Sequence, residues 1–229
     1  MNLPGGVIAT RPLHFIWLAD CSGSMDQDGK IQALNNAIRE AIPSMRRVAN
    51  ENPYADVFVR AVRFSSGAEW HIPTPTLVQQ FEWADLQAGG VTDLGQALKL
   101  VAGQLHSPPM TSRGLPPVLV LVSDGQPTDG FEEGLQAVLA TDWGRKSVRI
   151  AIAIGQDADY DVLKRFSSPD LEPLQANNAD TLVSFIKWAS TAVLQSVSCT
   201  GRLGSTGGVV PVPVPQPLSG GAAAVGDAW

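Results

Sequence analysis

Apolar stretches of strand length alternate with helical patterns along most of this chain. The stretches that predict strands cover residues 14–19, 57–64, 67–72, 118–122, 148–154 and 171–174. Between them, apolar residues recur every three or four positions, which predicts amphipathic helices over 30–48, 94–105, 131–140, 160–166 and 182–193. This alternation is typical of a doubly wound α/β fold, with a mostly parallel sheet and helices on both faces. We expect six strands, one of them a short antiparallel edge strand at 67–72.

Proline positions bear on two of these elements. Pro43 lies inside the first helical pattern, where its missing amide hydrogen should kink the helix or end it early. Pro73 and Pro75 follow the stretch at 67–72 and should end that strand.

The C-terminal segment differs in composition from the rest. Residues 200–229 are rich in Gly, Pro and Ala, and the segment should not fold alone. Its Val-Pro repeats favour an extended polyproline geometry, which acts as a stiff spacer. The terminal Trp229 also permits a second interpretation, in which the tail docks on a partner. We therefore divide the chain into an N-terminal arm (1–12), a domain (13–199) and a tail (200–229).

Composition narrows the function classes. The 229 residues are 44% hydrophobic and carry a net charge of -6, without a basic run that would suit nucleic acid. No apolar stretch approaches the roughly 20 residues that span a bilayer, and the first residues lack the features of a signal peptide. We therefore expect a cytoplasmic protein that binds neither nucleic acid nor membrane. Cys21 and Cys199 show no metal-type spacing and are expected to be reduced thiols.

Side chains that carry oxygen cluster where the first strand ends. Asp20, Ser22 and Ser24 alternate along the turn, and Gly23 lets the backbone turn tightly. A carboxylate and two hydroxyls are hard ligands that suit Mg²⁺ or Mn²⁺, with Ca²⁺ as an alternative. Because three ligands do not complete an octahedron, further oxygens must come from distant loops.

Two later positions can supply those oxygens. Asp124 follows the buried strand at 118–122, and Thr92 lies before the helix that begins at residue 94. By itself Thr92 would be interpreted as a helix cap. In open parallel sheets, however, ligands bind outside the carboxyl ends of the strands, and right-handed connections bring both residues to that edge. The predicted metal site consists of Asp20, Ser22, Ser24, Thr92 and Asp124.

The charges of this site indicate its use. Two carboxylates neutralise a divalent cation, and the other three ligands are neutral hydroxyls, so the cation can still attract a carboxylate. With five protein positions, at least one place of the octahedron stays open. We expect a partner protein to donate an Asp or Glu side chain there.

A metal-dependent hydrolase is the main alternative class. The chain lacks the G-x-S-x-G turn and the phosphate-binding loops of nucleotide enzymes. The three histidines, at positions 14, 71 and 106, are expected to be structural or exposed rather than catalytic. Three tryptophans, at positions 70, 83 and 143, are interpreted either as core residues or as partner contacts.

The motif Asp20-Cys21-Ser22-Gly23-Ser24, followed by Thr92 and Asp124-Gly125, resembles the metal-ion-dependent adhesion site of von Willebrand factor A domains. The resemblance implies direct ligation by Ser22, Ser24 and Thr92, with Asp20 and Asp124 often acting through water. Segments 124–129 and 185–190 are similar to the TerY-like subgroup, which is associated with bacterial tellurite-resistance gene clusters.

That subgroup implies a non-enzymatic adaptor in a stress-response system. Its expected partners are a protein phosphatase of the metal-dependent PP2C type, a protein kinase, or both. Other bacterial members of the superfamily imply an alternative, an adaptor for a MoxR-type AAA+ ATPase.

Overall fold

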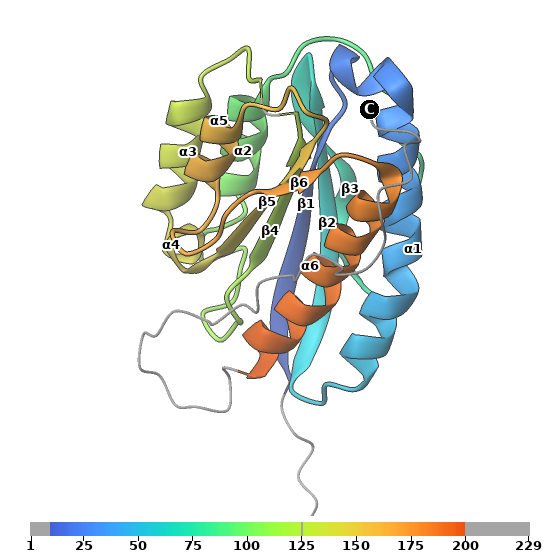
Figure 1. Ribbon diagram of the computed structural model, residues 1–229. Helices are drawn as coiled ribbons and strands as arrows, with labels where there is room; N and C mark the ends of the chain where they lie inside the picture. The colour runs from blue at the N-terminus through green and yellow to red at the C-terminus, as the bar shows by residue number, and fades with distance from the viewer. Residues whose placement is uncertain (1–9, 125, 200–229) are drawn as a thin grey trace, which may run out of the picture.

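The computed structural model describes residues 10–124 and 126–199 (Figure 1). Six strands form one sheet in the order β3-β2-β1-β4-β5-β6. The strands are β1 (Arg11–Asp20), β2 (Ala55–Ser65), β3 (Gly67–Leu77), β4 (Val118–Ser123), β5 (Val148–Ile154) and β6 (Leu174–Ala176). β3 pairs antiparallel with β2, and all other neighbours pair in parallel. The predicted fold class, a six-stranded α/β sheet with one antiparallel edge strand, is confirmed.

Helices cover both faces of the sheet. On one face α1 (Lys30–Asn50) and α6 (Ala179–Cys199) lie side by side (Figure 1). The other face carries α2 (Leu94–Ala102), α3 (Phe131–Ala140), α4 (Asp142–Lys146) and α5 (Tyr160–Phe166). A 3-10 segment, η1 (Gly23–Gly29), links β1 to α1.

The central strand β1 contributes side chains to two separate cores. Phe15 and Trp17 pack in the core beneath α1 and α6, whereas Ile16 and Leu18 pack in the core beneath α2 and α3. Every residue of β4 and β5 is buried as well. Because both faces of these strands are covered, their sequences are mostly apolar, without regular polar alternation, and the buried Arg149 of β5 is an exception.

Proline ends neither of two elements that it was expected to end. The kink that was the alternative at Pro43 stays a prediction. α1 continues past the exposed Pro43 to Asn50, because Met45 and Val48 beyond it are buried against the sheet. The free energy of that packing outweighs the cost of about 3 kcal/mol for proline within a helix. β3 is also longer than predicted and contains Pro73 and Pro75. An edge strand tolerates them because none of the described strands pairs with its outer side, and the pairing with β2 is irregular at this point.

Other boundaries differ by a few residues. β1 begins at Arg11, three residues before the predicted start. β6 covers Leu174–Ala176 and not 171–174, because the chain is still turning where Leu171 N–H bonds to the Ser168 carbonyl at 2.9 Å. The short elements η1 and α4 were not predicted. The tail at 200–229 lies outside the described residues, so its docking remains a prediction.

Candidate metal centre

Asp20, the last residue of β1, is completely buried and organises the turn that follows it. Its Oδ1 accepts a hydrogen bond from the Ser22 backbone amide at 2.8 Å. Its Oδ2 accepts one from Ser123 Oγ, across the β1–β4 pair, at 2.5 Å. The carboxylate thus shapes its own loop and also fixes the end of β4, an arrangement of the Asx-turn kind.

The two serines of the turn lie together. Ser22 is in extended conformation just before η1, and its Oγ is 2.9 Å from Ser24 Oγ. Ser22 is buried and Ser24 is half-buried. Both hydroxyls therefore lie together at the carboxyl end of the sheet, in the turn that Asp20 organises.

Backbone hydrogen bonds attach the Thr92 loop to the Asp20 turn. Gly89 N–H donates to the Cys21 carbonyl at 2.8 Å, and Gly23 N–H donates to the Gly90 carbonyl at 3.0 Å. Thr92 is buried two residues beyond Gly90.

Thr92 does not act as a helix cap. The amides of Gly95 and Gln96, at the start of α2, donate instead to the carboxylate of Asp129, at 2.7 and 2.8 Å. The backbone of Thr92 exchanges hydrogen bonds with Thr128, at 3.1 and 2.9 Å. Thr92 therefore lies between the Asp20 turn and the β4–α3 connection, as the metal-site hypothesis requires.

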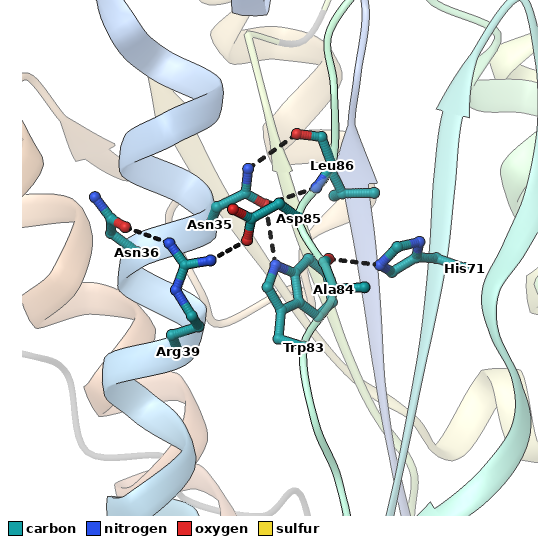
Figure 2. Close-up of polar contacts among 8 residues, drawn as sticks. All are labelled: Asn35, Asn36, Arg39, His71, Trp83, Ala84, Asp85 and Leu86. Atoms are coloured by element: carbon teal, nitrogen blue, oxygen red, sulfur yellow. Dashed lines mark hydrogen bonds and ion pairs between the residues drawn. The ribbon is translucent and has the colours of Figure 1, made fainter.

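A buried amide anchors the segment that leads to Thr92. Asn35 of α1 donates from Nδ2 to the Leu86 carbonyl at 2.9 Å (Figure 2). Its Oδ1 accepts from Leu86 N at 2.9 Å and from Trp83 Nε1 at 3.0 Å. At the surface, Arg39 pairs with Asp85 beside these bonds. Asn35 thus holds an irregular segment against α1 shortly before Gly89 and Gly90.

Asp124 follows β4 and is 2% exposed. Its backbone carbonyl accepts a hydrogen bond from the Asp159 amide at 2.8 Å, which ties it to the start of α5. Its Oδ1 is buried without any hydrogen-bond partner among the described residues. Asp20 and Asp124 also take part in none of the ion pairs found there. A buried carboxylate oxygen is ordinarily paired with a positive charge or a hydrogen-bond donor, and Oδ1 of Asp124 has neither among the described residues.

The environment of Asp20 disfavours its charge. Burial is the main cause that raises the pKa of Asp20 to about 6. Hydrogen bonds from Ser123 and Ser22 lower this pKa, and the negative charge of Asp124 raises it. The two carboxylates therefore lie close enough to repel each other, and a cation between them would remove that cost.

The residues present fit a small divalent cation. The site offers two carboxylates and three hydroxyls, all oxygen donors that Mg²⁺ or Mn²⁺ accepts. Within residues 10–124 and 126–199 there is no group of three or more His, Cys, Asp or Glu side chains that could hold a metal. Any site here therefore depends on its hydroxyls. Burial raises the pKa of the free Cys21 thiol to about 12, so this residue is no thiolate ligand.

Several supporting residues escaped the sequence analysis. Ser123, Thr128 and Asp129 bond to or beside the predicted ligands, and Gln126 donates to the Asp157 carbonyl at 2.8 Å. Ser123 directly precedes Asp124, and the other three lie in the segment 124–129 that carries the TerY-like resemblance, but none of the four was assigned a role at the site. Asn35 had no signal, because one polar residue on a helix is ordinarily exposed.

Two of the histidines and two of the tryptophans make contacts that stabilise the fold. His71 bonds to the Ala84 carbonyl at 2.8 Å, and His14 stacks on Phe58. Trp83 and Trp143 are buried in the cores, whereas Trp70 is half-buried. The interpretation as core residues is therefore confirmed for Trp83 and Trp143.

Comparisons with known proteins agree with this fold. The model of the von Willebrand factor type A domain family matches residues 16–187. No curated protein matches the sequence.

No helix among the described residues is long and apolar enough to cross a membrane.

Solved structures with similar folds include three bacterial and archaeal proteins. One is "von Willebrand factor type A" from Catenulispora acidiphila, with 18% identity and a TM-score of 0.62 over 82% of this chain and 43% of that chain. The ArnB paralog VWA2 from Sulfolobus acidocaldarius has 21% identity and a TM-score of 0.55, over 77% and 44%. The pilus adhesin SpaC from Lactobacillus rhamnosus GG has 15% identity and a TM-score of 0.64, over 82% and 31%. This chain spans less than half the length of each, and at these identities the similarity shows the fold alone.

Proposed function

Because this chain belongs to the von Willebrand factor type A domain family, we propose that it is a metal-dependent protein-interaction module without enzymatic activity. Domains of this family commonly mediate protein interaction or adhesion. The proposal extends that general role to a specific site, the five residues Asp20, Ser22, Ser24, Thr92 and Asp124.

The observation that best supports the proposal is the burial of the Asp124 carboxylate. Its Oδ1 is buried without a partner, and the charge of Asp124 acts on the buried carboxylate of Asp20. Burial of two interacting carboxylates costs free energy unless a positive charge compensates them. Proteins retain such an arrangement where a function requires it.

Ser22, Ser24 and Thr92 would hold the cation directly, and Asp20 and Asp124 would act through water. When bound, the cation supplies a Lewis-acidic position that can accept a carboxylate from outside the chain. Asp20 keeps the serine turn in shape through the Ser22 amide, and Gly23 and Gly90 keep the Thr92 loop beside it. The protein's residues thus arrange the oxygens in advance, which lowers the entropic cost of binding.

The partner would present an Asp or Glu side chain. By its resemblance to the TerY-like subgroup, the protein would serve in the cytoplasm, in a stress or tellurite-resistance system with a PP2C-type phosphatase or a kinase. An adaptor for a MoxR-type AAA+ ATPase is the alternative. Affinity purification with the wild type, Asp20→Ala and Ser22→Ala distinguishes these two kinds of partner. A protein that the wild type retains and that both variants lose is the metal-dependent partner.

Isothermal titration with Mg²⁺ and Mn²⁺ tests the site itself. The wild type should bind one equivalent of metal. Ser22→Ala removes a direct ligand and should raise the dissociation constant at least tenfold, which corresponds to a loss of roughly 1.4 kcal/mol or more of binding free energy. Asp26→Asn is the matched control: Asp26 is an exposed acid in the same turn and should leave affinity within about twofold. Absence of binding in the wild type, with and without a partner, refutes the site.

Enzyme assays address the alternative class. Purified protein should show no turnover of phosphoester or peptide substrates in the presence of Mg²⁺ or Mn²⁺. Turnover that disappears in Asp124→Ala would replace the interaction module with a metal-dependent hydrolase.

A further inference from the structure

A small cavity lies on the α2 face of the sheet, far from the candidate metal centre. Its polar lining is His14 of β1, Arg60 of β2 and Gln104, just after α2, and the rest of its lining is apolar. His14 precedes Asp20 on the same strand by six residues, which corresponds to about 20 Å. The cavity measures about 40 Å³. That is room for about three water molecules, or for one small ion.

Arg60 brings a buried positive charge to this cavity. The residue is 6% exposed, and its guanidinium carbon lies 3.5 Å from the centre of the Trp70 ring. One terminal nitrogen donates to Gln104 Oε1 at 2.8 Å and the other to the Pro73 carbonyl. Nε has no hydrogen-bond partner among the described residues. All the partners of this guanidinium are therefore neutral.

No described carboxylate compensates Arg60. The ion pairs of residues 10–124 and 126–199 do not include it. Burial lowers the pKa of Arg60, without any acidic neighbour to raise it. The carbonyls at the end of α2 add partial negative charge nearby, but those of Lys99, Val101 and Ala102 already accept backbone hydrogen bonds. Within the described part of the chain, the positive charge of Arg60 is thus without a counter-ion.

The other polar groups of the cavity are also donors. Because Gln104 Oε1 accepts from Arg60, the amide nitrogen of the same side chain is available to donate. The half-buried His14 ring stacks on Phe58, and none of the described residues forms a hydrogen bond with its nitrogens. Burial lowers the pKa of His14, and the charge of Arg60 lowers it further. The cavity therefore combines positive potential with hydrogen-bond donors, and no described residue of its lining is negatively charged.

We propose that this cavity binds a small monovalent anion, of the size of formate or chloride, through Arg60, with His14 and Gln104 as further donors. An anion there compensates the buried guanidinium, and charge-assisted hydrogen bonds are the stronger kind. By fixing Arg60, the anion would also stabilise its hydrogen bonds to the Pro73 carbonyl of β3 and to Gln104 after α2. Its role is structural and independent of the metal centre.

Formate-dependent unfolding of the full chain tests the proposal. Urea unfolding is measured with EDTA in sodium formate and, at equal ionic strength, in sodium gluconate, whose anion is too large for the cavity. A ligand at ten times its Kd lowers the unfolding equilibrium constant about tenfold. The wild type should show such a saturable, formate-specific decrease. Equal stability in the two salts overturns the proposal.

Three variants locate the effect. Arg60→Gln should lose the formate response. Arg63→Gln should keep it, because it removes a half-buried arginine of β2 that pairs with Glu69 of β3. If Arg60→Gln does not fold, Gln104→Glu decides, because it places a carboxylate of the same shape beside Arg60. That variant should fold and be at least as stable as the wild type in gluconate, without a response to formate. A full formate response in Gln104→Glu contradicts the assignment.

Discussion

Gly23 and Gly90 are joined by a backbone hydrogen bond of 3.0 Å, donated by the Gly23 amide. This bond connects the turn that carries Ser22 and Ser24 to the loop that carries Thr92. Gly90 has a φ of 87°, and a Cβ at this position would lie 2.5 Å from Ser66 Oγ. Glycine is therefore required at position 90 both by backbone conformation and by space.

Substitution of Gly90 should separate the two halves of the site. In Gly90→Ala the strain at a φ of 87° and the crowding against the side chain and backbone of Ser66 should displace the loop and Thr92, so Mg²⁺ affinity by titration calorimetry should fall at least tenfold. Gly67→Ala is the matched control, because Gly67 has a φ of 91° but no atom within 4 Å of its added Cβ. That variant should lose about 1 kcal/mol of stability from backbone strain and keep its Mg²⁺ affinity within about threefold. Equal affinities in the two variants would show that the loop position does not govern the site.

Replacement of Asp124 should affect stability and metal binding in opposite directions. In EDTA, Asp124→Asn should raise the free energy of unfolding by about 1 to 2 kcal/mol, because it removes a negative charge that repels Asp20 and whose buried Oδ1 has no partner among the described residues. Mg²⁺ should stabilise the wild type but not this variant. Urea unfolding with and without Mg²⁺ measures both effects, and destabilisation of the variant in EDTA argues for a structural role of Asp124. The exposed Asp26→Asn should change stability by less than about 0.5 kcal/mol.

Loss of the buried side-chain amide of Asn35 should lower the free energy of unfolding more than loss of most other polar side chains. Asn35→Ala leaves Trp83 Nε1 and both backbone polar groups of Leu86 without partners (Figure 2). At about 1 to 3 kcal/mol for each such group, partly offset by water, we expect a loss of about 3 kcal/mol in urea unfolding. Asn36→Ala, on the exposed side of the same helix, should cost less than about 0.5 kcal/mol. A similar small loss in both variants would mean that the segment is held by apolar packing alone.

His14 should contribute a loss of stability in mild acid, which Asp20 opposes, because the raised pKa of Asp20 adds stability as the pH falls through about 6. Burial and Arg60 lower the pKa of His14 in the folded protein, so the unfolded chain binds this proton first as the pH falls below about 6.5. The contribution of His14 is therefore present above pH 6.5 and is lost as the pH falls through the folded pKa. On going from pH 7 to 5, the free energy of unfolding of His14→Gln should increase relative to that of the wild type, because the variant lacks the His14 contribution and both proteins keep that of Asp20. Parallel curves would contradict a depressed pKa.

Local patterns in the sequence predicted much of the fold. The strand at 148–154 and the helices at 131–140 and 160–166 have the predicted bounds, because hydrophobic periodicity and the adjacent turn residues are local properties. The position of Asp20 and Asp124 at the carboxyl edge of the sheet also followed from the sequence, since parallel strands share a direction. β1 and β4 do pair in parallel, which brings these two residues to one edge.

Packing and long-range distances decided the rest. Pro43 and Pro73 lie inside elements that local rules would end, because burial of neighbouring apolar residues and the open edge of β3 outweigh the local cost. The lone Oδ1 of Asp124 and the uncompensated charge of Arg60 could not be predicted from their neighbours in the sequence. Whether a buried charge has a counter-ion depends on groups from separate elements that meet only in the folded chain. The sequence by itself therefore determined the candidate ligands and their order, and only the tertiary structure decided which buried charges lack a partner.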